Sequence, residues 1–354
     1  MIYYNIVIAI LIFIALIFKK NIGIYICSTI FFLFAAFRAP SVGTDVSGYF
    51  SVFDDLLNHT IYEQVFNSGL PSSRDPFFYI IVRILKTVGI SNQMILALIA
   101  LLVAISCGFI IYKYSCDYFM TYLLLFCLRF YIFTFSGLRA AVAQSILILA
   151  LPLLFDGKKI KFVIWIIIAS LFHKSALFSL FMVPLVLLKN ISVILLSGII
   201  IIVLDFYTNI FSTVTNYITI LSTYENYIII PKENTRSGLT TIVIYLAISI
   251  IYLLFFLNKK KQDKMDNINY KFYKITIFGV LFYILNLRYP NASRIGDFFC
   301  IYYCILLPNM LNKIGEKYNE NIIIKIMLVL LLIIQFNVYG AGAGSDNYIF
   351  FWNK

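Results

Sequence analysis

Uninterrupted apolar runs, rich in isoleucine, leucine and phenylalanine, recur along the whole chain with short polar segments between them. The chain is 62% hydrophobic and only 12% charged, whereas soluble domains carry about 25% charged residues. A helix of about 20 apolar residues crosses the hydrocarbon of a bilayer, and a membrane β-barrel would instead show weak alternation over about ten residues. The sequence therefore predicts an all-α, polytopic integral membrane protein with a single transmembrane domain over residues 1–354.

About twelve apolar segments are candidate transmembrane helices. They are residues 3–18, 21–37, 91–112, 117–135, 138–155, 160–173, 176–188, 191–206, 239–257, 271–288, 294–311 and 322–339. The segment 77–88 is too short and too charged to span, which favours a re-entrant or interfacial helix. The segments 160–173 and 176–188 are short and tightly linked, which favours a broken or tilted pair. Two long polar loops, 38–76 and 207–238, interrupt the pattern, and loops of this length are usually functional.

Lysine marks one side of the predicted membrane domain. If the N-terminus lies outside, sixteen of the twenty lysines fall in inside loops, in agreement with the positive-inside rule. This predicts extracytoplasmic N- and C-termini and places both long loops outside. Topology and anionic lipid headgroups then explain the net charge of +12, so we expect no nucleic-acid partner.

Arginine has the opposite distribution, because none of the eight arginines falls in an inside loop. They are Arg38, Arg74, Arg83, Arg129, Arg139, Arg236, Arg288 and Arg294. A guanidinium binds carboxylate or phosphate in a bidentate manner, so this placement favours an anion-binding function outside. The alternative is that individual arginines cap helices or pair with carboxylates. Candidate partners are Asp45, Asp54, Asp55, Asp75 and Asp297.

The stretch 136–177 brings an arginine and a histidine to the same predicted side. Arg139 opens one apolar run, a lysine-rich turn follows, and His173 ends the next run. An arginine at a helix N-terminus is unfavourable to the helix dipole, which argues for an anionic partner nearby. Histidine titrates near neutral pH and serves as a general base or acid; alternatively, His173 is an interfacial histidine at a span end. With only two histidines and no cysteine cluster, we expect no metal site.

Three short motifs contain these and neighbouring residues. Arg38 precedes a Val-Gly-Thr-Asp segment at 42–45, with Tyr49 close behind, and Asp45 is a base, a metal ligand or, as composition favours, a turn former. Gly-Leu-Arg at 137–139 is followed by Ala143, and Phe172-His173 is followed by Ser-Ala-Leu at 175–177. Together these motifs resemble the EpsG family of exopolysaccharide and O-antigen polymerases, which are related in role to Wzy proteins. The resemblance covers most of the chain and is clearest between residues 38 and 188.

The resemblance implies a GT-C-like glycosyltransferase that works on the outer face of the bacterial inner membrane. Such a polymerase moves the growing glycan from undecaprenyl pyrophosphate to a sugar hydroxyl of another lipid-linked repeat unit. The donor is already activated, so we expect no cofactor. We expect His173 to act as the base and Arg38 with Asp45 to shape the acceptor side. The expected pyrophosphate ligands are Arg139, Arg288 and Arg294, with Arg236 as a further candidate.

Two other functions are alternatives at this stage. One is a flippase for lipid-linked oligosaccharides, and the other is a membrane acyltransferase that modifies the polysaccharide. A flippase would place charges along a cavity reachable from both faces, whereas here the arginines lie outside. The expected partners are the lipid bilayer and undecaprenyl-pyrophosphate-linked oligosaccharides, with a chain-length regulator and a flippase as further candidates.

Overall fold

The computed structural model is helical throughout the part of the chain that it describes. These residues are 1–67, 69–73, 75–209, 211, 213, 236–256, 264–289, 292–318, 321–342 and 344–353. Among them the only strand-like feature is an antiparallel bridge between Arg38 and Phe350. The predicted all-α class is confirmed.

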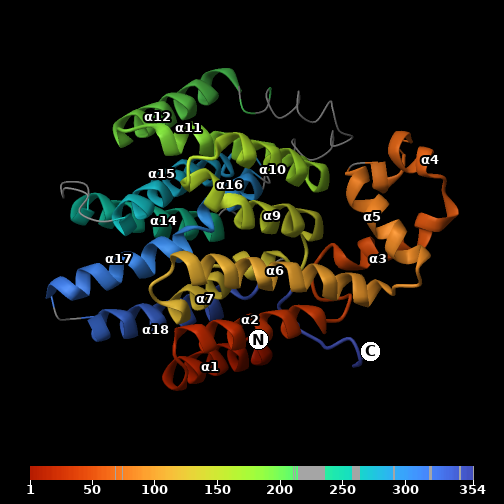
Figure 1. Cartoon of the computed structure of the whole chain (residues 1–354), viewed down its shortest axis with the longest axis horizontal. Coiled ribbons are helices and arrows are strands. Elements are labelled where there is room, and N and C mark those ends of the chain that lie inside the picture. Colours follow the sequence, from red (N-terminus) through yellow and green to blue (C-terminus); the bar gives the residue numbers. More distant parts are fainter. Residues whose placement is uncertain are drawn as a thin grey trace. The chain divides into compact units, whose positions relative to one another are not determined.

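The helices follow one another with short connections (Figure 1). The first half contains α1 (Ile2–Ile17), α2 (Lys20–Ala36), α3 (Val46–Asp55), η1 (Leu56–Asn58), α4 (Ile61–Phe66), η2 (Pro71–Ser73), α5 (Pro76–Thr87), α6 (Asn92–Tyr114), α7 (Tyr118–Cys127), α8 (Phe130–Phe133) and α9 (Leu138–Phe155). The second half contains α10 (Lys159–Phe172), η3 (Lys174–Phe181), α11 (Met182–Leu187), α12 (Ile191–Thr208), α14 (Arg236–Phe256), α15 (Lys264–Leu285), α16 (Ala292–Cys300), α17 (Tyr303–Tyr318) and α18 (Asn321–Tyr339).

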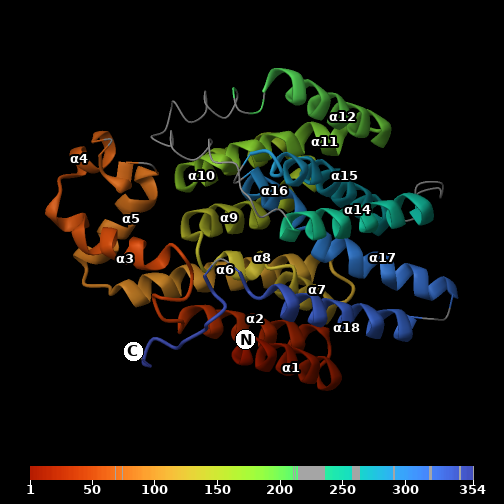
Figure 2. The same cartoon turned by 180° about the vertical axis from the view of Figure 1, so that it is seen from behind.

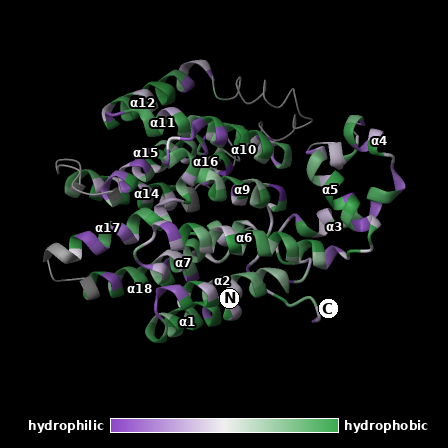
Figure 3. Cartoon of the chain, viewed as in Figure 1, coloured by the Kyte–Doolittle hydropathy of each residue, from purple (hydrophilic) through white to green (hydrophobic). Residues whose placement is uncertain are grey.

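Several helices are long and apolar enough to cross a membrane. Within the described residues, four helices of at least 18 residues qualify: Asn92–Tyr114, Leu138–Phe155, Ile191–Thr208 and Met265–Leu285. Taking α16 with α17, which are bent by 41° at a short break, makes five. In the same part of the chain, six shorter apolar helices have 10 to 17 residues, and the ribbons of α1, α6 and α12 are coloured hydrophobic over most of their length (Figure 3). The chain is a membrane protein, while the count of twelve spans stays a prediction.

Three of the predicted spans are interrupted. The segment 117–135 divides into α7 and α8 at Arg129, whose φ of 68° lies in the left-handed region. That turn brings the Arg129 guanidinium close to Gly342 and into electrostatic contact with Asp346. The segment 294–311 breaks between α16 and α17, and the expected broken pair 160–188 contains the 3-10 helix η3. The predicted helix at 77–88 is present as α5.

Two compact units divide the chain. Unit 1 contains residues 1–151, 167–174 and 308–354, and unit 2 contains residues 152–166 and 175–307. In unit 1, α2 and α6 run side by side in both views (Figure 1, Figure 2). The close approach needs a glycine, because a Cβ on Gly108 would lie 2.5 Å from the Ser28 hydroxyl.

Unit 1 has polar contacts at two opposite ends of its helices, which we call the loop end and the lysine end. At the loop end, the N-terminal ammonium of Met1 donates to the Asp346 carbonyl at 3.1 Å, and the Gly43 amide donates to the Gly344 carbonyl at 3.3 Å. At the lysine end, Lys20 donates to the Ser115 carbonyl and Lys325 pairs with Asp117 at 2.9 Å. The helices of unit 1 therefore separate these contacts into two groups, while the side of the membrane that each group faces stays a prediction. Met1 and the C-terminal segment up to residue 353 lie at the loop end, where the Phe351 amide donates to the Phe37 carbonyl.

Unit 2 packs around α15. Its neighbour α16 comes close because a Cβ on Gly279 would lie 2.6 Å from Phe299 and 2.7 Å from the Cys300 sulfur. Lys274 of α15 is 3% exposed and donates to the carbonyls of Val186 and Leu188 at 2.7 and 2.8 Å. This lysine caps the C-terminus of α11, where a cation also complements the helix dipole.

Candidate functional site

The first two motifs meet at the loop end of unit 1. The Thr44 amide donates to the Ser136 hydroxyl at 2.9 Å, which ties the Val-Gly-Thr-Asp segment to the turn before α9. Gly43 makes this possible, because its φ is +107° and a Cβ there would lie 2.7 Å from the Phe135 carbonyl. A side chain is strained in that conformation. The segment 42–45 therefore supports the turn from which Arg139 projects.

Arg139 lies in the first turn of α9 and is held on two sides. Its Nε donates to the Tyr49 hydroxyl at 3.0 Å, and its Nη1 contacts Asp75 Oδ2 at 2.7 Å. The guanidinium also lies 5.7 Å from the ring of Tyr49 and 5.9 Å from that of Tyr79. The Arg139 side chain is 14% exposed and the Asp75 side chain 0%. This is a charge-assisted ion pair removed from water, for which breaking one partner is strongly destabilising.

His173 reaches the same carboxylate oxygen. It follows the last residue of α10, and its Nδ1 lies 3.5 Å from Asp75 Oδ2. That separation is slightly longer than a usual hydrogen bond, which measures about 2.7–3.2 Å between heavy atoms. A small side-chain movement would close the difference. The rings of Phe77 and Phe172 form a T-shaped contact at 5.2 Å, which holds the start of α5 against the end of α10. The third motif thus joins the first two through Asp75.

The charges around Asp75 leave an excess of positive charge. Lys174 interacts electrostatically with the Asp75 carboxylate and with the Arg139 guanidinium. Among the described residues, Arg139, Lys174 and His173 therefore surround one buried carboxylate. Partly buried cations in this arrangement favour an anionic ligand.

Tyr49 supplies a neutral hydroxyl at this position. Burial raises the pKa of Tyr49 above its ordinary value, and the Arg139 guanidinium offsets part of that rise. The hydroxyl therefore stays protonated at neutral pH, and its oxygen accepts the Arg139 hydrogen bond without adding charge.

Arg38 and Asp45 occupy different surroundings from each other. Arg38 is only 2% exposed, donates to the carbonyls of Ala35 and Phe135, and lies 4.6 Å from the Phe135 ring. Burial lowers its pKa to about 10, so it remains charged. Arg38 holds the end of α2 to the turn before α9. Asp45 is exposed at the N-cap position of α3, and its carbonyl accepts from the Tyr49 amide at 2.9 Å.

The other predicted arginines belong to unit 2. Arg288 donates to the Asp205 carbonyl at 2.9 Å and to the Asn209 side chain, and it lies 3.5 Å from the buried Asp205 carboxylate. Arg294 is exposed in the first turn of α16. Arg236 begins α14, but its side chain and most of the loop 207–238 lie outside the described residues.

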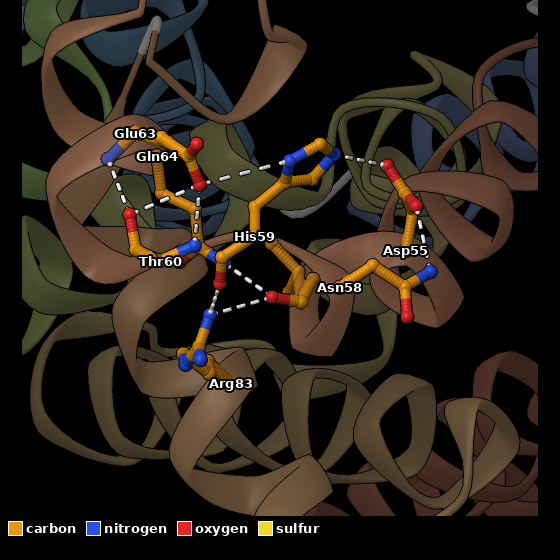
Figure 4. Close-up of polar contacts among 8 residues, drawn as sticks. Asp55, Asn58, His59, Thr60, Glu63, Gln64 and Arg83 are labelled. Atoms are coloured by element: carbon orange, nitrogen blue, oxygen red, sulfur yellow. Dashed lines mark hydrogen bonds and ion pairs between the residues drawn. The ribbon is translucent and has the colours of Figure 1, made fainter.

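The second histidine, His59, takes part in a separate polar cluster (Figure 4). Its Nε2 lies 2.9 Å from Asp55 and its Nδ1 lies 4.0 Å from Glu63. Hydrogen bonds from Asn58 and His59 lower the pKa of Asp55. Hydrogen bonds from Thr60 lower the pKa of Glu63. Thr60 and Glu63 together form the capping box at the start of α4. This cluster folds the loop between α3 and α5.

From the sequence, Asp75 was expected only as one of five possible carboxylate partners for the arginines, and in the structure it pairs with Arg139. Its position at the centre of the motifs, and the contribution of Lys174, were missed. The available signals were the Asp-Pro step that begins α5 and the position of Lys174 directly after His173. No group of three metal-ligating side chains occurs within the described part of the chain.

Comparison with known proteins gives one match. The model of the EpsG family matches residues 20–351, which is nearly the whole chain and includes all three motifs. No curated protein and no solved structure matches. The protein therefore belongs to the EpsG family.

Proposed function

We propose that this protein polymerises a surface polysaccharide at the outer face of the bacterial inner membrane. The EpsG family match and the apolar helices support a membrane protein with a polysaccharide polymerase-type function. In the proposed reaction, the growing glycan leaves undecaprenyl pyrophosphate and joins a sugar hydroxyl of a second lipid-linked repeat unit. The twelve-span, GT-C-like architecture is part of the same proposal.

One observation carries this proposal: the three motifs converge on a partly buried, positively charged cluster in unit 1. Arg139 and Lys174 supply the positive charge, and His173 lies beside them. A leaving pyrophosphate develops negative charge in the transition state, so cations placed beforehand stabilise that state more than the ground state. The proposal stands on unit 1 and does not require Arg288 or Arg294.

Each residue has a stated role in the transfer. The bond between the anomeric carbon and the phosphate oxygen breaks, and undecaprenyl pyrophosphate departs toward Arg139 and Lys174. The acceptor oxygen forms the new glycosidic bond, and its proton passes to His173. General base catalysis of this kind contributes about 10²–10⁴-fold in rate.

The orientation follows from the positive-inside rule. The lysine end of unit 1 faces the cytoplasm, and the loop end, with Met1, the C-terminal segment and the cluster, faces outward. Lipid-linked repeat units would reach the cluster from the outer leaflet, where the pyrophosphate lies at headgroup depth.

Purified protein in lipid nanodiscs, supplied with synthetic undecaprenyl-pyrophosphate repeat units, tests the reaction directly. We expect glycans of increasing length and release of undecaprenyl pyrophosphate. A donor that stays intact under all acceptor concentrations would contradict the proposal.

A deletion strain separates the alternatives. Loss of a polymerase leaves single repeat units capped onto the surface acceptor, which a ladder gel resolves. Loss of a flippase leaves lipid-linked units facing the cytoplasm. Loss of an acyltransferase leaves full-length chains that lack a substituent, so either of these last two results contradicts polymerisation.

A further inference from the structure

We propose that Asp75 is a positioning residue that holds His173 in the tautomer protonated at Nδ1, so that Nε2 is the nitrogen that accepts the proton. Its catalytic meaning rests on the proposed function, whereas the tautomer itself can be measured without any reaction. A single oxygen atom, Asp75 Oδ2, makes the two contacts that support this role.

The location of Asp75 requires compensation. Its side chain is 0% exposed, and a buried carboxylate is expensive unless it is paired and hydrogen-bonded. Arg139 supplies that partner, because its Nη1 lies 2.7 Å from Oδ2. Asp75 immediately precedes Pro76, the first residue of α5, so the start of that helix fixes its backbone.

The ionised carboxylate then determines the chemistry of the imidazole. A carboxylate only accepts hydrogen bonds, so the ring nitrogen that faces it carries the hydrogen. The nitrogen that faces Asp75 Oδ2, at 3.5 Å, is Nδ1 of His173. In the neutral ring the lone pair is therefore on Nε2, the nitrogen on the side of the ring away from Nδ1.

The same contact also serves the step after proton transfer. A proton taken up at Nε2 makes the ring an imidazolium, and Asp75 lies against it to offset the new charge. Among the described residues, Arg139 and Lys174 are the other charged groups that interact with this carboxylate. Removal of Asp75 would leave no carboxylate against Nδ1 to offset the new charge, so proton transfer should slow.

Arg139 is oriented by the same oxygen. Asp75 Oδ2 fixes Nη1 and the Tyr49 hydroxyl fixes Nε, so the guanidinium plane is set before an anion arrives. The Asp75 carboxylate thus orients both the Arg139 guanidinium, which receives the leaving group, and the His173 imidazole, which acts as the base for the acceptor. Preorganisation of this kind affects kcat more than substrate binding.

A purely structural ion pair between Asp75 and Arg139 is the competing interpretation. It predicts that Asp75 variants lose stability but does not link the His173 tautomer to Asp75. Tautomer state and the separate changes in kcat and KM therefore distinguish the two interpretations.

The decisive experiment is ¹⁵N NMR of histidine-labelled full-length protein in lipid bilayers. The chain has only two histidines, and His59→Gln removes one signal and assigns the other. At a pH where the ring is neutral, we expect His173 to carry its hydrogen on Nδ1. A wild-type His173 with its hydrogen on Nε2 overturns the proposal, whatever the variants do.

Asp75→Asn completes the test, because an amide nitrogen can donate to Nδ1 and so permits the other tautomer. We expect the Nδ1–H signal to weaken, kcat for elongation to fall about 10²–10⁴-fold, and KM for the lipid-linked donor to change less than tenfold. Asp75→Glu should recover part of kcat. An unchanged tautomer together with an unchanged kcat in Asp75→Asn refutes the positioning role. Absence of elongation by the wild-type protein refutes the proposed function, while the wild-type tautomer still decides the positioning role.

Discussion

Arg139→Lys is the substitution that most directly tests the anion site. Lysine keeps the positive charge but lacks the planar fork, so one ammonium cannot reproduce both the Asp75 contact at 2.7 Å and the Tyr49 contact at 3.0 Å. A hydrogen bond to a charged group contributes about 1.5–3 kcal/mol, and a cation over an aromatic face about 0.5–2 kcal/mol. We therefore expect a loss of about 2–4 kcal/mol of transition-state stabilisation, or about 30- to 1,000-fold in kcat.

Lysine is a better probe here than alanine. Arg139→Ala would leave the buried Asp75 carboxylate without its cation, and breaking such a pair costs about 3–5 kcal/mol of stability. Loss of folded protein would then be indistinguishable from loss of catalysis. Arg139→Lys keeps a cation near Asp75, so the protein should remain folded in detergent.

The assay measures initial elongation rates with synthetic lipid-linked repeat units, alongside thermal denaturation of each purified protein. Arg83→Lys is the matched control. Arg83, like Arg139, makes two hydrogen bonds, in this case to the carbonyls of Leu56 and His59, but it lies in the separate cluster of Figure 4. We expect the control to retain the wild-type kcat. Wild-type turnover by Arg139→Lys would refute the role of the guanidinium fork, and equal losses in both variants would refute its specificity.

Three further predictions concern the base, the motif glycine and the loop. His173→Gln should lower kcat by about 10²–10⁴-fold while His59→Gln leaves it unchanged; equal rates for both would remove the base role. Gly43→Ala should lower the thermal stability of the purified protein by about 1–3 kcal/mol, because φ is +107° there, and an unchanged melting temperature would contradict the assigned strain. The pKa values of Asp55 and Glu63 are lowered in the folded loop. Their contribution to the stability of the loop is therefore fully present above the pKa values of the unfolded chain, and it is lost as the pH falls through the lowered pKa values of the folded chain. Pepsin should accordingly cut the chain between α3 and α4 faster as the pH falls below about 5. The control is the variant with Asp55→Asn and Glu63→Gln. A cleavage rate that rises no more in the wild-type protein than in this variant would contradict the prediction.

Most of the fold class was predictable because hydrophobicity and charge act locally. A long apolar run must either bury itself or enter the bilayer, so the all-α membrane class follows from composition and segment length alone. The lysine pattern likewise anticipated the two ends of unit 1, where Lys20 and Lys325 lie opposite Met1 and Asp346. Breaks within spans were not predictable where they depend on distant contacts, as at Arg129 beside Asp346.

The candidate site was predictable only in part. Arg139 and His173 stand out in the sequence because a charge at a span end is unusual in an apolar chain. By itself, the sequence thus determined the membrane setting, while the side on which the polar chemistry lies and the roles of Arg139 and His173 stay predictions.

Tertiary structure decided what those residues do for one another. Asp75 is separated by 64 residues from Arg139 and by 98 from His173, and no local pattern records such a pairing. The folded structure also separates residues of the same type. Arg38, unlike Arg139, donates to backbone carbonyls inside unit 1, and His59, unlike His173, folds a loop. Side-chain type determines which interactions are chemically available, but distance and desolvation decide which of them form, and both exist only in the folded chain.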